Sequence, residues 1–215
     1  MVSGSIIAVT GVDGSGKTTI ARMLALHLSS RGFRVKVVWV KSLHTLAYLV
    51  YRLMRALWGV EYVVNPSGVV VEHYATRYMA GMGGLWGLIE YLSLLPHLLR
   101  VWLLSSLGYA VICDRFIPDF LATVSLRVGD ELWWARSILG RHLLALQVRQ
   151  RCALLDAGPR VVLARRPDAE YTRRELEKLI AIYRTVARQV GAQLVRATRP
   201  PSLIAAEILK LLSRA

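Results

Sequence analysis

The sequence is poor in acidic residues and in side-chain amides. It holds 14 Asp and Glu against 28 Lys and Arg, for a formal net charge of +14, and Asn65 is its one asparagine. Depletion of thermolabile amides is typical of proteins from hot environments. The basic residues form no block of five or six like charges. We therefore expect a diffuse basic surface with local phosphate sites; nucleic acid is a possible partner but not the favoured one.

Cysteine is also scarce, with only Cys113 and Cys152 in the chain. Each lies in an apolar run, and the two lack the spacing of a metal or redox motif. The five histidines show no ligand spacing either. We expect two buried structural thiols, with neither a metal centre nor a disulfide.

Long uncharged hydrophobic runs are missing, although 54% of the residues are hydrophobic. A membrane span needs about 20 apolar residues, and Val101–Cys113, between Arg100 and Asp114, is too short. Glu90 and Pro96 interrupt the stretch before it. No signal peptide is expected, because the chain leads directly into an apolar, strand-like run. These features predict a cytoplasmic protein without a membrane span, whose sheet is buried on both faces.

The most informative segment is Gly11–Thr18, GVDGSGKT, a complete phosphate-binding loop. An apolar, strand-like run precedes it and an amphipathic, helix-like run follows. Strand, glycine-rich turn and helix together direct backbone N–H groups and a helix N-terminus at one anion. Lys17 can reach the β- and γ-phosphates of a nucleotide, and the Thr18 hydroxyl can bind Mg²⁺.

The rest of the chain alternates strand-like and helix-like runs, as in a parallel α/β sheet. We predict a single domain over residues 1–215 with five strands: Ser5–Thr10, Val35–Val40, Tyr109–Cys113, Cys152–Leu155 and Gln193–Arg196. Thr172 and Glu175 form a capping box that starts a helix.

A helical insertion over about 42–107 is large enough to build an acceptor pocket. Its pattern is broken near 61–68, where Asn65-Pro66 occurs, and near 81–84. Pro96 should kink or split the helix around it. Most aromatic residues of the insertion are expected in the core or on a dimer surface.

Two further features narrow the function. The strand-like run ending at Asp114 is followed by Arg115, and ligands of open α/β sheets bind at the carboxyl ends of strands. There Asp114 can hold Mg²⁺ through water and Arg115 can grip a phosphate, although a surface ion pair would have the same sequence. The basic stretch 165–171, with Arg165 and Arg166, is either a lid over a transferred phosphoryl group or a solvated turn.

In these motifs the chain resembles the thymidylate kinase family of nucleoside monophosphate kinases. The resemblance rests on Gly11–Thr19, on Asp114-Arg115-Phe116, on Leu154-Leu155-Asp156 with Pro159, on the lid stretch and on Tyr183. It covers nearly the whole chain in order.

The resemblance implies a P-loop three-layer sandwich with a five-stranded parallel sheet, Mg²⁺ and ATP as donor, a nucleoside monophosphate acceptor and a homodimer. It places the following residues at the donor: Gly11, Asp13, Gly14, Ser15, Gly16, Lys17, Thr18, Thr19 and Arg165. The metal would lie at Thr18 and Asp114, and catalysis would use Lys17, Asp114, Arg115 and Arg166. Asp13 would also sit by the acceptor sugar, and Arg115 would also serve the acceptor phosphate.

The acceptor side departs from the family pattern. A Glu-Pro or Pro-Glu turn is replaced by the stretch that begins at Lys41, and Lys41 can take the place of an acceptor-phosphate arginine. His73 stands where a phenylalanine often lies four residues before an arginine, here Arg77. The leading hypothesis is therefore transfer from ATP to a nucleoside monophosphate, with dTMP favoured. The alternatives are another acceptor (a nucleoside, a sugar or an RNA hydroxyl) and a nucleotide-binding regulator without turnover.

Overall fold

The computed structural model describes residues 3–40, 45–59, 61–73 and 76–213. Its centre is a five-stranded sheet in the order β2-β5-β1-β6-β7, with every neighbouring pair parallel. The strands are β1 (Ile6–Thr10), β2 (Val35–Trp39), β5 (Ala110–Asp114), β6 (Arg151–Asp156) and β7 (Gln193–Arg196). All five expected strands are confirmed, with bounds that shift by at most one residue. The middle strands β1 and β5 are buried at every position, as a sheet covered on both faces requires.

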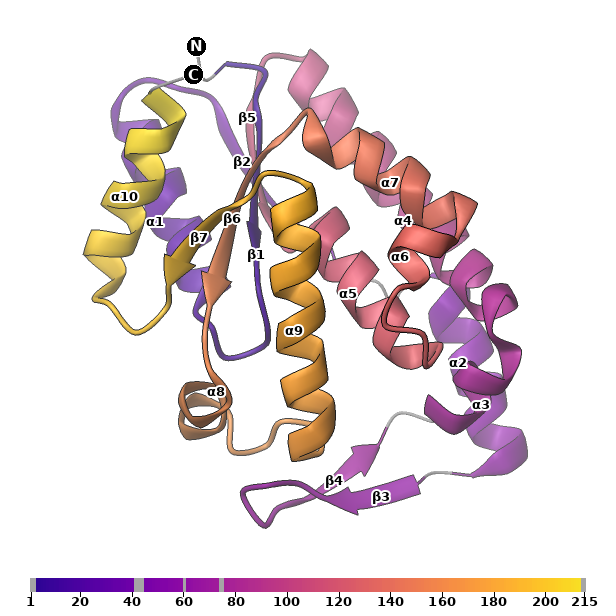
Figure 1. Ribbon diagram of the computed structural model, residues 1–215. Coiled ribbons are helices and arrows are strands. Elements are labelled where there is room, and N and C mark those ends of the chain that lie inside the picture. Colours follow the sequence, from indigo (N-terminus) through magenta and orange to yellow (C-terminus); the bar gives the residue numbers. More distant parts are fainter. Residues whose placement is uncertain (1–2, 41–44, 60, 74–75, 214–215) are drawn as a thin grey trace.

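Helices cover both faces of this sheet (Figure 1). On one side lie α1 (Lys17–Ser30) and α10 (Pro201–Ser213), which pack on each other. The other side carries α4 (Gly84–Ser106), α5 (Ile117–Arg127), α7 (Ile138–Val148) and α9 (Arg173–Gln189). Two short helices, α6 (Trp133–Arg136) and α8 (Pro159–Arg165), complete this part of the chain. The expected three-layer α/β arrangement is confirmed.

The insertion between β2 and β5 is less helical than predicted. It contains α2 (Leu46–Trp58), α3 (Thr76–Met82) and α4, but also an antiparallel hairpin of β3 (Glu61–Val64) and β4 (Val70–His73). Asn65 forms the turn: its side-chain oxygen accepts from the backbone N–H groups of Ser67 and Val69, at 2.9 and 3.0 Å. Such local bonds make asparagine a turn residue. The break expected near 81–84 is confirmed as the boundary between α3 and α4.

Helix α4 runs through Pro96 without ending, so of the two outcomes expected there, a kink or a split, the split is wrong. Buried leucines on both sides of the proline, Leu94 and Leu98, anchor the two halves in the same core. Judged by length and composition only, α4 could cross a membrane, and it is the one helix among the described residues that is long and apolar enough to do so. The same composition suits a core helix of a soluble protein, and α4 carries Glu90 fully buried inside the molecule.

The capping box that starts α9 is present. The Thr172 hydroxyl accepts from the backbone N–H of Glu175 at 3.3 Å, and the Glu175 carboxylate accepts from the N–H of Thr172 at 2.9 Å. Cys113 is buried as expected, whereas Cys152 is only half-buried. Burial raises the pKa of both thiols, which keeps them protonated and unreactive.

Candidate active site

The phosphate loop leaves β1 at the carboxyl edge of the sheet and turns into α1. Gly16 caps the helix in the left-handed region at φ 98°. A Cβ on Gly11 would meet the carbonyl oxygen of Leu155 at 2.7 Å, so the loop and the end of β6 approach as closely as glycine allows. This packing fixes the loop and the first turn of α1 together at the carboxyl edge of the sheet.

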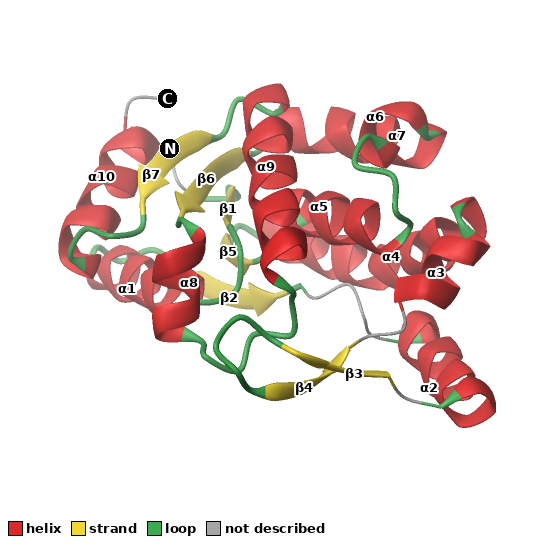
Figure 2. Ribbon diagram, turned by 60° about the horizontal axis from the view of Figure 1, so that its bottom comes forward, coloured by secondary structure: helices red, strands yellow, loops and turns green. Residues whose placement is uncertain are grey.

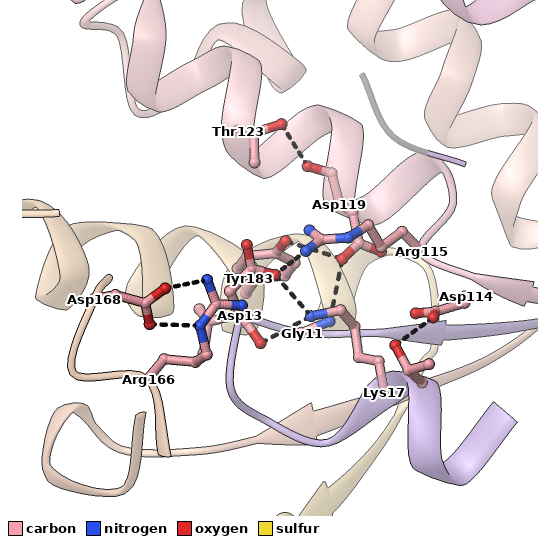
Figure 3. Close-up of polar contacts among 12 residues, drawn as sticks. Gly11, Asp13, Lys17, Asp114, Arg115, Asp119, Thr123, Arg166, Asp168 and Tyr183 are labelled. Atoms are coloured by element: carbon pink, nitrogen blue, oxygen red, sulfur yellow. Dashed lines mark hydrogen bonds and ion pairs between the residues drawn. The ribbon is translucent and has the colours of Figure 1, made fainter. Parts of the chain in front are cut away.

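Lys17 is buried at the base of this loop, with 5% of its surface exposed. Its Nζ donates to the carbonyl of Val12 at 2.8 Å and to Asp13 Oδ1 at 3.3 Å (Figure 3). Burial lowers the pKa of Lys17, while the charges of Asp119 and Asp114 oppose that shift. The ammonium group is thus held by carboxylates in a desolvated place, where an added phosphate would bind it strongly.

Thr18 and Asp114 bring β5 to the start of α1. The Thr18 hydroxyl donates to Asp114 Oδ2 at 2.6 Å. The other oxygen, Asp114 Oδ1, is buried and has no hydrogen-bond partner among the described residues. A hydroxyl oxygen beside a carboxylate with an unused acceptor fits the oxygen ligands that Mg²⁺ prefers, and Mg²⁺ needs few protein ligands because it keeps several waters.

Arg115 follows in an unusual backbone conformation, with φ at 71°. Its backbone N–H is held by the carbonyl of Val9 at 3.0 Å, and its guanidinium forms an ion pair with Asp13. A non-glycine residue in the left-handed region costs about 1 kcal/mol or more, and such residues gather at functional sites. The turn directs the guanidinium back over the phosphate loop, where Figure 3 shows it facing Asp13 and Lys17.

Asp119, a residue that the sequence analysis missed, joins three segments of the site. Its carboxylate accepts from the backbone N–H of Phe116 at 3.0 Å, from the Tyr183 hydroxyl at 3.0 Å and from the N–H of Gly11 at 3.4 Å. The side chain is 3% exposed. One carboxylate therefore ties the phosphate loop, the start of α5 and the middle of α9 together. An acidic residue just after a proline, in what proves to be the first turn of α5, was the available signal, but this helix was not predicted from the sequence.

The arginine-rich stretch 165–171, called the loop 165–171 below, begins at Arg165, the last residue of α8, and continues as the connection to α9. It borders the same cleft. Arg165 reaches back to the phosphate loop and β7, donating to the carbonyl of Ala197 at 2.9 Å and of Gly14 at 3.4 Å. Arg166 forms a two-pronged ion pair with Asp168, at 2.8 and 3.1 Å. This pair raises the pKa of the guanidinium and lowers the pKa of the carboxyl.

These groups line one cleft of about 1090 Å³. Its wall also holds aromatic and basic residues that sequence reasoning had not singled out: Trp39, Tyr48, Tyr51, Arg55, Phe120 and Arg127. The Arg127 guanidinium donates to the buried carboxylate of Glu90 at 2.7 Å, and the Trp86 indole donates to the same oxygen at 2.6 Å. A planar, charged donor is thereby fixed in the wall of the cleft.

The structure brings together most of the predicted donor residues, because Gly14, Gly16, Thr18, Thr19, Arg165 and Arg166 also line the cleft. Ser15 is buried beneath it. The structure does not describe the side chains of the other three residues predicted for the acceptor side. Lys41 lies outside the described residues. His73 ends β4 and Arg77 lies in α3, but their side chains are not described.

A phosphate loop after the central strand of a parallel sheet, with an acidic-basic pair after the adjacent strand, defines a P-loop kinase-like arrangement. No family model matches the chain. The chain is similar to a protein of Pyrococcus horikoshii named "Probable thymidylate kinase", with 29% identity over 186 residues. The similarity covers 85% of this chain and 79% of that protein. It suggests the thymidylate kinase family.

The bonds of Asp119 generate a stability prediction. Asp119→Asn should lower the free energy of unfolding by about 2 to 3 kcal/mol, because an amide nitrogen would face buried N–H and O–H donors. Tyr183→Phe, which removes one donor and leaves the carboxylate, should cost about 1 kcal/mol. Urea unfolding followed by circular dichroism measures both. An Asp119→Asn protein as stable as the wild type would show that the carboxylate does not hold these segments together.

Proposed function

We propose that the chain is a nucleotide kinase that transfers the γ-phosphoryl group of ATP to a nucleoside monophosphate, with dTMP as the favoured acceptor. The observation that carries this proposal is the meeting of Lys17, Asp13 and Arg115 beside the Thr18–Asp114 pair in one cleft. Two cationic side chains beside a pair that could bind Mg²⁺ suit phosphoryl transfer, because this reaction needs positioning and charge neutralisation more than covalent catalysis. The similarity to a probable thymidylate kinase supports the same class of reaction.

On the donor side, the phosphate loop would hold the β- and γ-phosphates, with Lys17 between them. Thr18 and Asp114 would hold Mg²⁺, which, when bound, neutralises phosphate oxygens. Arg165 and Arg166 would close over the donor from the loop 165–171 and exclude water from the transferred group.

On the acceptor side, Arg115 would bind the acceptor phosphate as a planar fork and bring its oxygen in line with the γ-phosphorus. Asp13 would accept a hydrogen bond from the acceptor sugar. Lys41, His73 and Arg77 stay candidates for the acceptor phosphate and base. The aromatic residues Trp39 and Tyr48 offer stacking surfaces in the same part of the cleft.

We also propose a homodimer in the cytoplasm. The outer side of α4 exposes apolar residues at intervals of three and four: Leu85, Leu88, Leu92, Leu95, Leu99 and Trp102. That spacing forms a continuous apolar stripe suited to packing against another helix. Sedimentation velocity should give a mass of two chains.

The proposed roles of Lys17 and Arg115 are tested by substitution. Lys17→Ala should keep its fold and lose about a hundredfold or more in turnover, because one preorganised charged donor contributes on the order of 3 kcal/mol to lowering the barrier. Arg115→Lys should also lose activity relative to the wild type, since a point charge cannot replace a two-pronged contact. Steady-state ADP release measures both, with circular dichroism as the control for folding. An Arg115→Lys enzyme that behaves as wild type would refute the fork.

The acceptor is tested with a panel of dTMP, dUMP, dCMP, thymidine and a short structured RNA, each with Mg²⁺ and ATP. We expect dTMP to be phosphorylated fastest. Its 3′-deoxy analogue should be a poor acceptor, by up to about 10⁴-fold, because Asp13 would lose its hydroxyl partner. Faster transfer to thymidine or RNA than to any monophosphate would overturn the acceptor while leaving the donor site in place.

A further inference from the structure

Asn65 connects the β3–β4 hairpin to the arginine-bearing loop 165–171, about a hundred residues away in the chain. Its side-chain nitrogen donates to the carbonyl of Pro167 at 2.6 Å and to the carbonyl of Ala169 at 3.0 Å. Figures 1 and 2 show the hairpin beside the connection between α8 and α9. The Asn65 residue is 3% exposed; its bond to Ala169 is buried and its bond to Pro167 is partly buried.

Both the oxygen and the nitrogen of the Asn65 side-chain amide make two hydrogen bonds, and the two atoms contact different segments. The oxygen accepts from the N–H groups of Ser67 and Val69 and thereby shapes the hairpin turn. The nitrogen, with its two N–H donors, binds the loop carbonyls. Asparagine is the small side chain that supplies both an acceptor oxygen and N–H donors. This accounts for the position of the one asparagine in an amide-poor sequence.

The two carbonyls flank Asp168, and Asp168 holds Arg166 through two bonds. The turn is closed by a bond from the N–H of Ala169 to the carbonyl of Arg166 at 3.1 Å. Arg166 in turn lies against the phosphate loop: a Cβ on Gly14 would meet the Arg166 Cγ at 3.2 Å. Fixed contacts thus run from Asn65 through the loop to the phosphate loop.

We propose that Asn65 is a positioning residue for phosphoryl transfer. By holding the carbonyls of Pro167 and Ala169, it fixes the turn that carries Arg166 over the phosphate loop. The hairpin belongs to the insertion that builds the acceptor side, and the loop belongs to the donor side. The Asn65 contact therefore makes the placement of a donor-side arginine depend on the docking of an acceptor-side element. This inference rests on the proposed function for its effect on turnover, but not for the contact itself.

Asn65→Asp separates the two tasks of the side chain. The carboxylate keeps an oxygen for the turn, but it has no N–H donors and repels the two carbonyls. We expect the amides of residues 166 and 168–171 to exchange hydrogen about tenfold faster, with the exchange of β1 and β5 unchanged. The kcat for transfer should fall by about tenfold to a hundredfold, with the KM for ATP changed much less, because a misplaced arginine costs transition-state contacts more than binding.

The pH dependence gives a readout that a merely structural role would not share. A protonated Asp at position 65 carries one O–H donor and can bind one of the two carbonyls. The ratio of variant to wild-type kcat should therefore rise as pH falls through the pKa of the introduced carboxyl, because protonation restores one donor to the two carbonyls. Ser67→Ala is the matched control. It lies exposed in the same turn, and its backbone N–H, not its side chain, contacts Asn65.

Hydrogen exchange of residues 166 and 168–171 in Asn65→Asp equal to that in Ser67→Ala would overturn the contact. Faster exchange with an unchanged kcat would overturn the positioning role. If the wild type transfers phosphate to no acceptor, the proposed function fails, and loop exchange in the two variants still decides whether Asn65 holds the loop.

Discussion

The buried carboxylate of Asp119 is the constraint on which the site depends. Three segments distant in sequence donate to it: the phosphate loop at Gly11, the first turn of α5 at Phe116 and the middle of α9 at Tyr183. A buried carboxylate is costly unless its acceptors are used, so this arrangement favours one relative placement of the three segments. Its negative charge also supports the protonated form of Lys17 against desolvation.

Around that point the sheet supplies the rest of the geometry. The register of β1 and β5 pairs Val9 with Asp114, so the two site segments leave the sheet side by side. The phosphate loop and Arg115 then need only short turns to face each other, and the strained backbone of Arg115 provides one of them. The loop 165–171 follows the next strand, β6, through α8, and lines the same cleft.

Local patterns predicted the sheet and the strand and helix on either side of Gly11–Thr18 well, because their signals are local. An apolar run, a glycine-rich turn and the capping box at Thr172 each fix their own conformation. The hairpin at Asn65 was missed for the opposite reason: its strands are short, and the bonds of Asn65 to Pro167 and Ala169 come from another part of the chain. The Glu90–Arg127 pair was missed for the same reason, because its two residues lie on different helices. Pro96 does not split α4, because the tertiary packing of this helix outweighs the local cost of the proline.

In the proposed kinase, donor and acceptor sites share one cleft, with Lys17 and Arg115 on either side of the transferred group. Calorimetric titration with adenosine and thymidine joined through five phosphates tests this most directly. We expect one ligand per chain, bound at least about tenfold more tightly than ATP or dTMP alone, with the gain lost in Lys17→Ala. Affinity no higher than that of ATP alone would contradict a shared cleft.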